Sequence, residues 1–183
     1  MKILIPIIFA LSIISCSFYS LAGSIPTHIK SIHIPLFENQ TSEFDLAENI
    51  TDFITNEFNE SGVLRVENNQ NYNSVLKGKI KSISDGPYTY DKEESVSEYR
   101  YKIDVHVEWY DIKNDKNIIE SNYSGYGAYG VSGDIGTDGI DNDFDGKIDN
   151  DDDDEFGEPR SFATKVAMSK IAEDILNDIM TTW

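Results

Sequence analysis

The stretch from Glu98 to Asp111 constrains the fold most, because apolar and polar residues alternate without interruption over eleven of its positions, from Tyr99 to Trp109. A period of two residues is typical of a β-strand with one buried face and one face in water. Its β-branched and aromatic residues also favour a strand. The residues predicted to be buried are Tyr99, Tyr101, Ile103, Val105, Val107 and Trp109. At about 3.3 Å per residue the strand extends roughly 35 Å, so we expect the central strand of a sheet with a large cover.

Two segments have the period of amphipathic helices and can supply that cover. The first begins after Asp45, which has Glu48 three residues on, the spacing of a capping box, and it ends at Gly62. Its apolar stripe consists of Leu46, Ile50, Phe53, Ile54 and Phe58. The second begins at Pro159 and Ser161, and Ala167, Ile171, Ile175 and Ile179 recur along it every four residues.

Four further segments, 29–37, 63–66, 75–83 and 118–126, are predicted strands. Pro35 has no N–H to donate, so the first strand lies at an edge or ends there. Asp85-Gly86-Pro87 is expected to end the third of them. The order β-α-β-β-β-β-α predicts a single-domain α+β fold, a mixed sheet of four to five strands with two helices packed on one face. This domain would comprise residues 29–130 and 159–183.

The N-terminus has the pattern of an export signal. An apolar run from Ile3 to Ile14 follows Lys2; it is too short to cross a bilayer of about 30 Å but suits a signal peptide. The run ends in Ile13-Ile14-Ser15-Cys16, which resembles the bacterial lipobox. We expect residues 1–15 to be removed, diacylglycerol and an acyl chain on Cys16, and a tether over residues 16–28. Cleavage after Ala22 is the alternative, but Cys16 is the only cysteine and an exported protein cannot form an internal disulfide with one.

Residues 131–158 form a strongly acidic insertion, with twelve carboxylates against one lysine from Asp134 to Glu158. Within it, Asp141 to Asp152 has the spacing of a twelve-residue calcium loop, with Gly146 at the sharp turn. The predicted ligands of a structural Ca²⁺ are Asp141, Asp143, Asp145, Lys147 through its carbonyl, Asp149 and Asp152. A solvated acidic linker is the alternative.

Charge and motif content argue against two function classes. The formal net charge of −18 argues against nucleic acid as a partner, because neutralising phosphates requires an excess of Lys and Arg. His28, His33 and His106 occur singly, and no Ser or Cys lies in a nucleophile-type turn, so we do not expect an enzyme. Residues 125–130 spell G-x-G-x-x-G, but an acidic segment follows where a phosphate site needs a helix.

Four cations lie on the predicted polar faces of strands that could be neighbours. They are Lys77 and Lys79 on one strand and Arg100 and Lys102 on the long strand. Lysines and arginines in such an array would suit a ligand with several phosphates or carboxylates. The alternative is an ordinary solvated sheet face, with Glu98, Asp104 and Glu108 as ion-pair partners.

Five segments resemble the LptE family of outer-membrane lipoproteins in their order and spacing: Ile34–Thr41, Gly62–Val66, Val75–Ile80, Pro87–Asp91 and Glu98–Ile103. The resemblance implies two helices on a mixed sheet, and a protein that assembles with and plugs the β-barrel lipopolysaccharide translocon. The expected partners are that barrel, lipopolysaccharide and the outer membrane, to whose periplasmic face the lipid anchors the protein. The acidic insertion departs from the family pattern.

Two other functions remain as alternatives. An exported lipoprotein that activates a cell-wall synthase or accompanies a secretion pore also has a strand ending in a Phe-x-Asn-x-Thr-like segment before a helix. The segments Tyr88–Asp91 and Tyr99–Tyr101 favour a role at the translocon over a role at a cell-wall synthase or secretion pore. A calcium-binding surface module would need repeated acidic loops, and the sequence has one copy.

Overall fold

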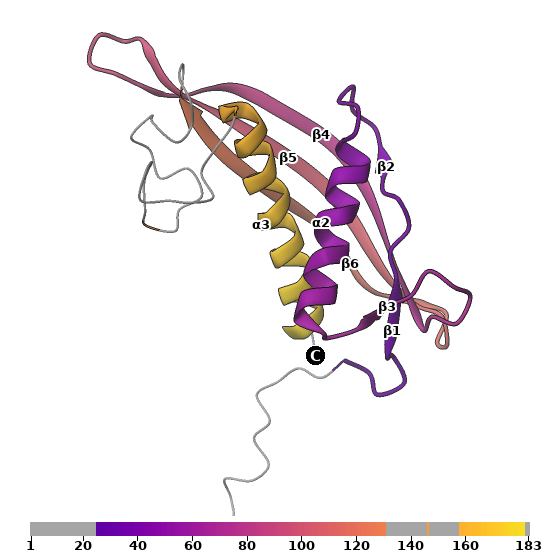
Figure 1. Cartoon of the computed structure of the whole chain (residues 1–183). Helices are drawn as coiled ribbons and strands as arrows, with labels where there is room; N and C mark the ends of the chain where they lie inside the picture. Colours follow the sequence, from indigo (N-terminus) through magenta and orange to yellow (C-terminus); the bar gives the residue numbers. More distant parts are fainter. Residues whose placement is uncertain (1–24, 131–145, 147–157, 182–183) are drawn as a thin grey trace, which may run out of the picture.

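A computed structural model describes residues 25–130, 146 and 158–181 of the chain. Two helices lie over one face of a long, twisted sheet (Figure 1). The elements are β1 (Ser31–His33), β2 (Glu38–Asn39), α2 (Leu46–Ser61), β3 (Arg65–Val66), β4 (Ser74–Tyr90), β5 (Val96–Asp111), β6 (Lys116–Gly130) and α3 (Pro159–Thr181). The strand order is β3-β1-β4-β5-β6, and β2 pairs with β4 beyond the end of β1. The sheet is mixed, because the pairs β1–β3, β1–β4 and β2–β4 are parallel and the pairs β4–β5 and β5–β6 are antiparallel. This arrangement confirms the α+β prediction.

Strand β5 contains the alternating stretch, and its two faces are those that the alternation predicts. The side chains of Tyr101, Ile103, Val105, Val107 and Trp109 are at most 1% exposed. Tyr99, nearer the start of the strand, is only partly buried and stacks on Tyr129 of β6. β5 lies between β4 and β6, so it is an inner strand flanked by the two other long strands.

Strand β4 is longer than predicted, because it does not end at Asp85-Gly86-Pro87. It continues to Tyr90 and stays paired with β5, with Pro87 opposite Tyr99, and the register shifts on either side of Thr89. In the described part of the chain, β2 pairs with β4 only at Lys79 and Ile80, so the second edge of β4 has no strand at Pro87. A proline at a free edge removes no ladder hydrogen bond, which is why the strand tolerates it.

The predicted first strand, 29–37, divides into β1 and a separate short β2. β1 ends at His33, two residues before Pro35, as the missing proline N–H led us to expect. The segment between them contributes Ile34 and Phe37 to the core, where each is at most 6% exposed.

Helix α2 begins and ends where the sequence predicts, but the capping box at its start is wrong. Asp45 has φ 62°, in the left-handed region, and its side chain makes no capping hydrogen bond. A capping carboxylate normally belongs to a residue in the β region, so this backbone conformation does not support the motif. The Asp45 carbonyl instead accepts the Asn49 N–H at 2.9 Å. At the other end Gly62, with φ 63°, donates its N–H to the Phe58 carbonyl at 3.2 Å.

Helix α3 packs against α2 and very closely against β6. A Cβ added to Gly125 would lie 1.9 Å from the Ala167 carbonyl oxygen, and one added to Gly127 would lie 2.4 Å from that of Ala163. Glycine at these two positions therefore permits the helix to approach the strand. The side chains of α3 buried in the resulting core are Phe162, Ala163, Ala167, Met168, Ile171, Ala172, Ile175, Leu176 and Ile179.

Strand β6 extends to Gly130, beyond the predicted end at residue 126. The G-x-G-x-x-G sequence thus lies within a strand, which agrees with its rejection as a phosphate-binding turn. No helix among the described residues is long and apolar enough to cross a membrane.

Candidate functional site on the open face of the sheet

The open face is the surface of β4, β5 and β6 opposite the two helices (Figure 1). It carries the predicted polar half of β5 and the residues of β4 and β6 paired with it. Its side chains include Lys77, Lys79, Ser82 and Ser84 of β4, Glu98, Arg100, Lys102, Asp104, His106, Glu108 and Tyr110 of β5, and Glu120, Asn122, Ser124 and Tyr126 of β6. The candidate ligand-binding and metal-binding groups among the described residues are gathered on this surface.

The four predicted ligand-binding cations lie on the open face in two pairs. Lys77 and Lys79 are on β4, with Lys79 opposite His106 of β5. Arg100 and Lys102 are on β5, and Lys102 is four residues from His106 along the strand. At about 3.3 Å per residue the two pairs are separated by roughly 13 Å. The members of each pair lie two residues apart on one strand and therefore on one face, but the strand register keeps the two pairs apart.

Two of the cations are held by carboxylates. Lys79 Nζ lies 3.1 Å from Glu38 Oε2, and the hydrogen bond from Lys79 lowers the pKa of Glu38. Lys102 Nζ lies 2.6 Å from Asp104 Oδ1, and Ser82 and Ser124 also donate to this carboxylate. Burial alone would raise the pKa of Asp104, but these three hydrogen bonds hold it below its ordinary value. Both are partly exposed ion pairs of the kind expected for a solvated sheet face.

The other two cations lie over aromatic rings. The Arg100 guanidinium is 4.6 Å from the ring centre of Tyr88 and 5.5 Å from that of Tyr126. Lys77 Nζ is 5.6 Å from the ring centre of Tyr110. In the described part of the chain Arg100 forms no ion pair with a carboxylate.

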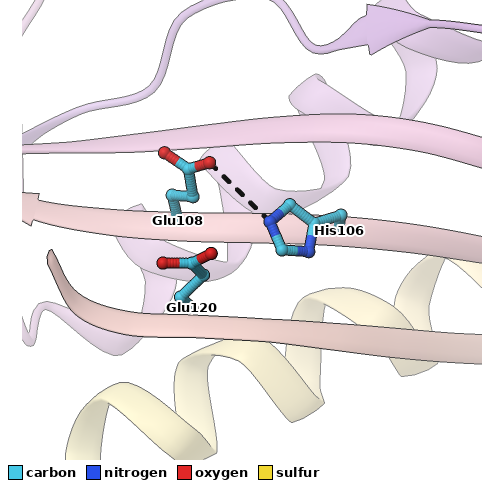
Figure 2. A group of neighbouring side chains, drawn as sticks. All are labelled: His106, Glu108 and Glu120. Atoms are coloured by element: carbon cyan, nitrogen blue, oxygen red, sulfur yellow. Dashed lines mark ion pairs between the residues drawn. The ribbon is translucent and has the colours of Figure 1, made fainter.

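A further cluster on this face was missed by sequence analysis, which treated His106 as isolated. Glu108 of β5 lies directly opposite Glu120 of β6, and His106 lies two residues along β5 on the same face. Ligand atoms of the three side chains lie within 4.8 Å of one another (Figure 2). Alternation along β5 already put His106 and Glu108 on one face, but Glu120 joins them only through the strand register.

Sequence analysis also missed a polar cluster at the start of α3. Arg160 donates from Nη2 to Glu43 Oε1 at 2.7 Å and from Nε to Asp85 Oδ2 at 2.6 Å. Tyr129 donates its hydroxyl to the other oxygen of Asp85 at 2.5 Å, and both burial and this bond raise the pKa of Tyr129. The Arg160 guanidinium also lies 4.8 Å from the ring centre of Tyr101. These contacts join the first turn of α3 to β4, β6 and the segment before α2.

The other two histidines have separate partners at the end of the sheet opposite the Arg160 cluster. His28 Nε2 lies 2.8 Å from Asp111 Oδ2, whereas His33 bonds the Glu67 carbonyl through Nδ1 at 3.0 Å and stacks on Tyr72. Burial alone would raise the pKa of Asp111, but the hydrogen bonds with His28 and Asn114 hold it below its usual value. His28 and His33 therefore contact different groups and do not contact each other.

The predicted lipidation site, Cys16, and the side chains of the predicted calcium ligands lie outside the described residues. Gly146, at the predicted sharp turn of the calcium loop, is described and has φ 94°. A positive φ is what glycine readily adopts, and its presence here is compatible with either a calcium loop or a linker.

The fold and the open face define a class of α+β proteins, in which two helices cover one side of a long mixed sheet and leave the other side polar. The hypothetical protein CT253 from Chlamydia trachomatis shares this fold, with a TM-score of 0.52 and 11% identity over 82% of this chain and 98% of that one. Protein XCC0632 from Xanthomonas campestris has a TM-score of 0.52 and 7% identity over 87% and 90% of the two chains. PelC from Paraburkholderia phytofirmans has a TM-score of 0.49 and 16% identity over 87% and 94%. No curated protein matches the sequence.

The family model of LptE, described as lipopolysaccharide-assembly, matches residues 29–182, and the chain belongs to this family. The match confirms the resemblance seen in the five sequence segments. The protein is accordingly a cell-envelope lipoprotein of the lipopolysaccharide-assembly type. Membership of a non-catalytic lipoprotein family also agrees with the expectation that the chain is not an enzyme.

Proposed function

We propose that this protein, anchored by lipids on Cys16 at the periplasmic face of the outer membrane, assembles with and plugs the β-barrel lipopolysaccharide translocon. In that position it aids the insertion of lipopolysaccharide into the outer membrane. The family match over residues 29–182 is the observation that carries the proposal. The family match favours this function over that of a lipoprotein that activates a cell-wall synthase or accompanies a secretion pore.

The open face suits contact with the inner wall of a large barrel. Outer-membrane barrels have a polar lumen, so a plug needs a polar surface toward that wall. Strands β4 to β6 present such a surface along their whole length, while α2 and α3 bury the apolar side of the sheet. The uncovered polar sheet is therefore compatible with a water-lined partner.

Arg100 is the cation best placed for a phosphate group of lipopolysaccharide. Its guanidinium lies over the rings of Tyr88 and Tyr126, two residues that are each 43% exposed. Planar guanidinium groups bind phosphate through two parallel hydrogen bonds, and neighbouring Lys102 adds a second positive charge. We assign Lys77 and Lys79 a weaker contribution, because a lysine ammonium does not form the two parallel hydrogen bonds that the Arg100 guanidinium can form, and Lys79, like Lys102, already pairs with a carboxylate.

The proposal predicts that the protein purified from membranes in mild detergent brings a large β-barrel with it. A photo-crosslinking residue at Ser84 or Tyr126, on the open face, is expected to attach to the barrel lumen. The same residue placed at Met168, which is 3% exposed on the buried side of α3, serves as the control that does not crosslink between chains. Recovery of peptidoglycan enzymes alone, with no barrel, would overturn the proposed function.

A separate measurement tests the ligand site. Arg100→Gln with Lys102→Gln is expected to weaken binding of purified lipopolysaccharide, whereas Lys77→Gln with Lys79→Gln removes the same charge and has a smaller effect. Equal losses in the two variants would point to net charge rather than to the Arg100 site.

A further inference from the structure

We propose that His106, Glu108 and Glu120 bind a divalent transition-metal ion, of which Zn²⁺ is the best match, on the open face of the sheet. All three side chains point to one spot above adjacent positions of β5 and β6 (Figure 2). His106 Nε2 lies 3.7 Å from Glu108 Oε1, and all three ligand atoms lie within 4.8 Å of one another. One imidazole and two carboxylates form a mixed nitrogen and oxygen set that suits Zn²⁺.

The histidine is oriented for metal binding by a residue outside the cluster. His106 Nδ1 lies 3.1 Å from Asn122 Oδ1, and an amide oxygen can only accept, so the proton of the neutral ring is on Nδ1. The Nε2 lone pair then points toward the two glutamates. Metal-binding histidines typically donate their second ring nitrogen in this way, which fixes the tautomer and the ring direction.

One of the carboxylates is also oriented from outside the cluster. Asn117 donates from Nδ2 to Glu120 Oε2 at 3.1 Å, which restricts the rotation of this carboxylate. Two asparagines of β6 thus hold one ligand each: Asn122 accepts from His106, and Asn117 donates to Glu120.

The charge around the cluster calls for a cation. Like charges directly across a strand pair are unfavourable, and Glu108 and Glu120 occupy such positions. Lys77 is opposite Glu108 on the other side, but its ammonium lies over the Tyr110 ring. Over the described ranges neither glutamate forms an ion pair with a lysine or arginine. A bound divalent ion would neutralise both carboxylates and accept the Nε2 lone pair.

The spacing fits an ion after small side-chain rotations. Bonds of about 2.0–2.2 Å in tetrahedral geometry place ligand atoms roughly 3.4 Å apart, so atoms that lie up to 4.8 Å apart must close by at most about 1.4 Å. The side chains of His106 and Glu108 are 28% and 39% exposed, so they have room to rotate. Three protein ligands leave the fourth position to water or to a group supplied by a partner.

The test uses the untagged full-length protein in detergent, freed of metal with a chelator. Zn²⁺ is titrated in a calorimeter with millimolar Ca²⁺ present, so that Ca²⁺ occupies acidic groups that prefer it. We expect saturable Zn²⁺ binding that Ca²⁺ does not displace. Co²⁺ in place of Zn²⁺ is expected to give the visible absorption bands of a four-coordinate site.

The variants separate this site from other acidic groups. His106→Gln and Glu120→Gln are each expected to remove the Co²⁺ bands and to weaken Zn²⁺ binding more than tenfold, and Asn122→Ala by about tenfold, the usual cost of losing an orienting residue. His33→Gln is the matched control and is expected to bind normally, since His33 belongs to β1 and contacts the Glu67 carbonyl and Tyr72 instead of the cluster. Circular dichroism in chelator confirms that each variant folds. Unchanged Zn²⁺ affinity in both His106→Gln and Glu120→Gln, or displacement of Zn²⁺ by Ca²⁺, would overturn the proposal.

Discussion

Gly125 of β6 lies so close to Ala167 of α3 that a Cβ on the glycine would be 1.9 Å from the alanine carbonyl oxygen. The atom it would meet belongs to the helix backbone, which cannot rotate away as a side chain can. The core beneath α3 depends on this approach, because Ala167 and Ile171 are fully buried against the strand.

Gly125→Ala is therefore expected to destabilise the protein by about 3 kcal/mol, the upper end of the cost of overpacking a core. Gly86→Ala is the control, since a Cβ at Gly86 of β4 meets no atom within 4 Å. Urea unfolding measures both variants. Similar midpoints for the two alanine variants would contradict the close contact between α3 and β6.

The fold could be predicted from the sequence wherever periodicity alone decides. Alternation along β5 identified its buried face, and four-residue spacing identified the inward side of α3. The end of α2 followed from Gly62, because a left-handed residue is needed there. These are local patterns, which depend on the direction of each Cβ within one element.

The errors arose where a neighbouring strand decides the outcome. The sequence around Pro87 predicts a strand end, yet β4 continues past Pro87, because one edge of β4 pairs with β5 there and the other edge is free. The cluster of His106 with Glu120 depends on the β5–β6 register, which no single-strand pattern contains. Arg160 contacts Glu43, which is distant in sequence, so composition gave no signal for that ion pair.

Trp109→Ala is expected to be among the most destabilising substitutions, at about 3–5 kcal/mol, because the indole of Trp109 is fully buried. Glu108→Ala, at the neighbouring, partly exposed position on the other face, is expected to change stability by less than about 0.5 kcal/mol in chelator. Thermal unfolding followed by circular dichroism distinguishes them. Equal effects would mean that the two faces of β5 are wrongly assigned.

Cys16→Ser is expected to leave an uncleaved precursor or a form released from membranes. Each buried CH₂ of an attached acyl chain contributes about 0.8 kcal/mol to membrane binding, so losing diacylglycerol and an acyl chain removes most of the anchor. Labelling with radioactive palmitate checks the modification directly. A wild-type protein that takes up no label would rule out the lipoprotein anchor.

Calcium is expected to bind the acidic insertion with a dissociation constant of about 10⁻⁴–10⁻³ M, the range of extracellular calcium modules. Asp141→Ala with Asp145→Ala is expected to abolish the calorimetric heat while leaving the fold intact. Asp52→Ala with Glu60→Ala removes the same charge from exposed positions of α2 and is expected to bind normally. If the calcium titration releases no heat and calcium leaves the protease sensitivity of residues 131–158 unchanged, the segment is an acidic linker.

Asp111→Asn is expected to destabilise the protein by about 1.5–3 kcal/mol at neutral pH, because it removes a buried carboxylate that accepts from His28 and Asn114. Those bonds hold the pKa of Asp111 below its ordinary value. The unfolded chain therefore takes up this proton first on acidification, so the contribution is complete above about pH 4 and is lost as the pH falls through the folded-state pKa. Urea unfolding at a series of pH values should show the difference between wild type and Asp111→Asn shrinking toward low pH. Asp52→Asn, at an exposed position of α2, should follow the wild type throughout, and a pH-independent cost of Asp111→Asn would mean that the carboxylate charge does not stabilise this end of the sheet.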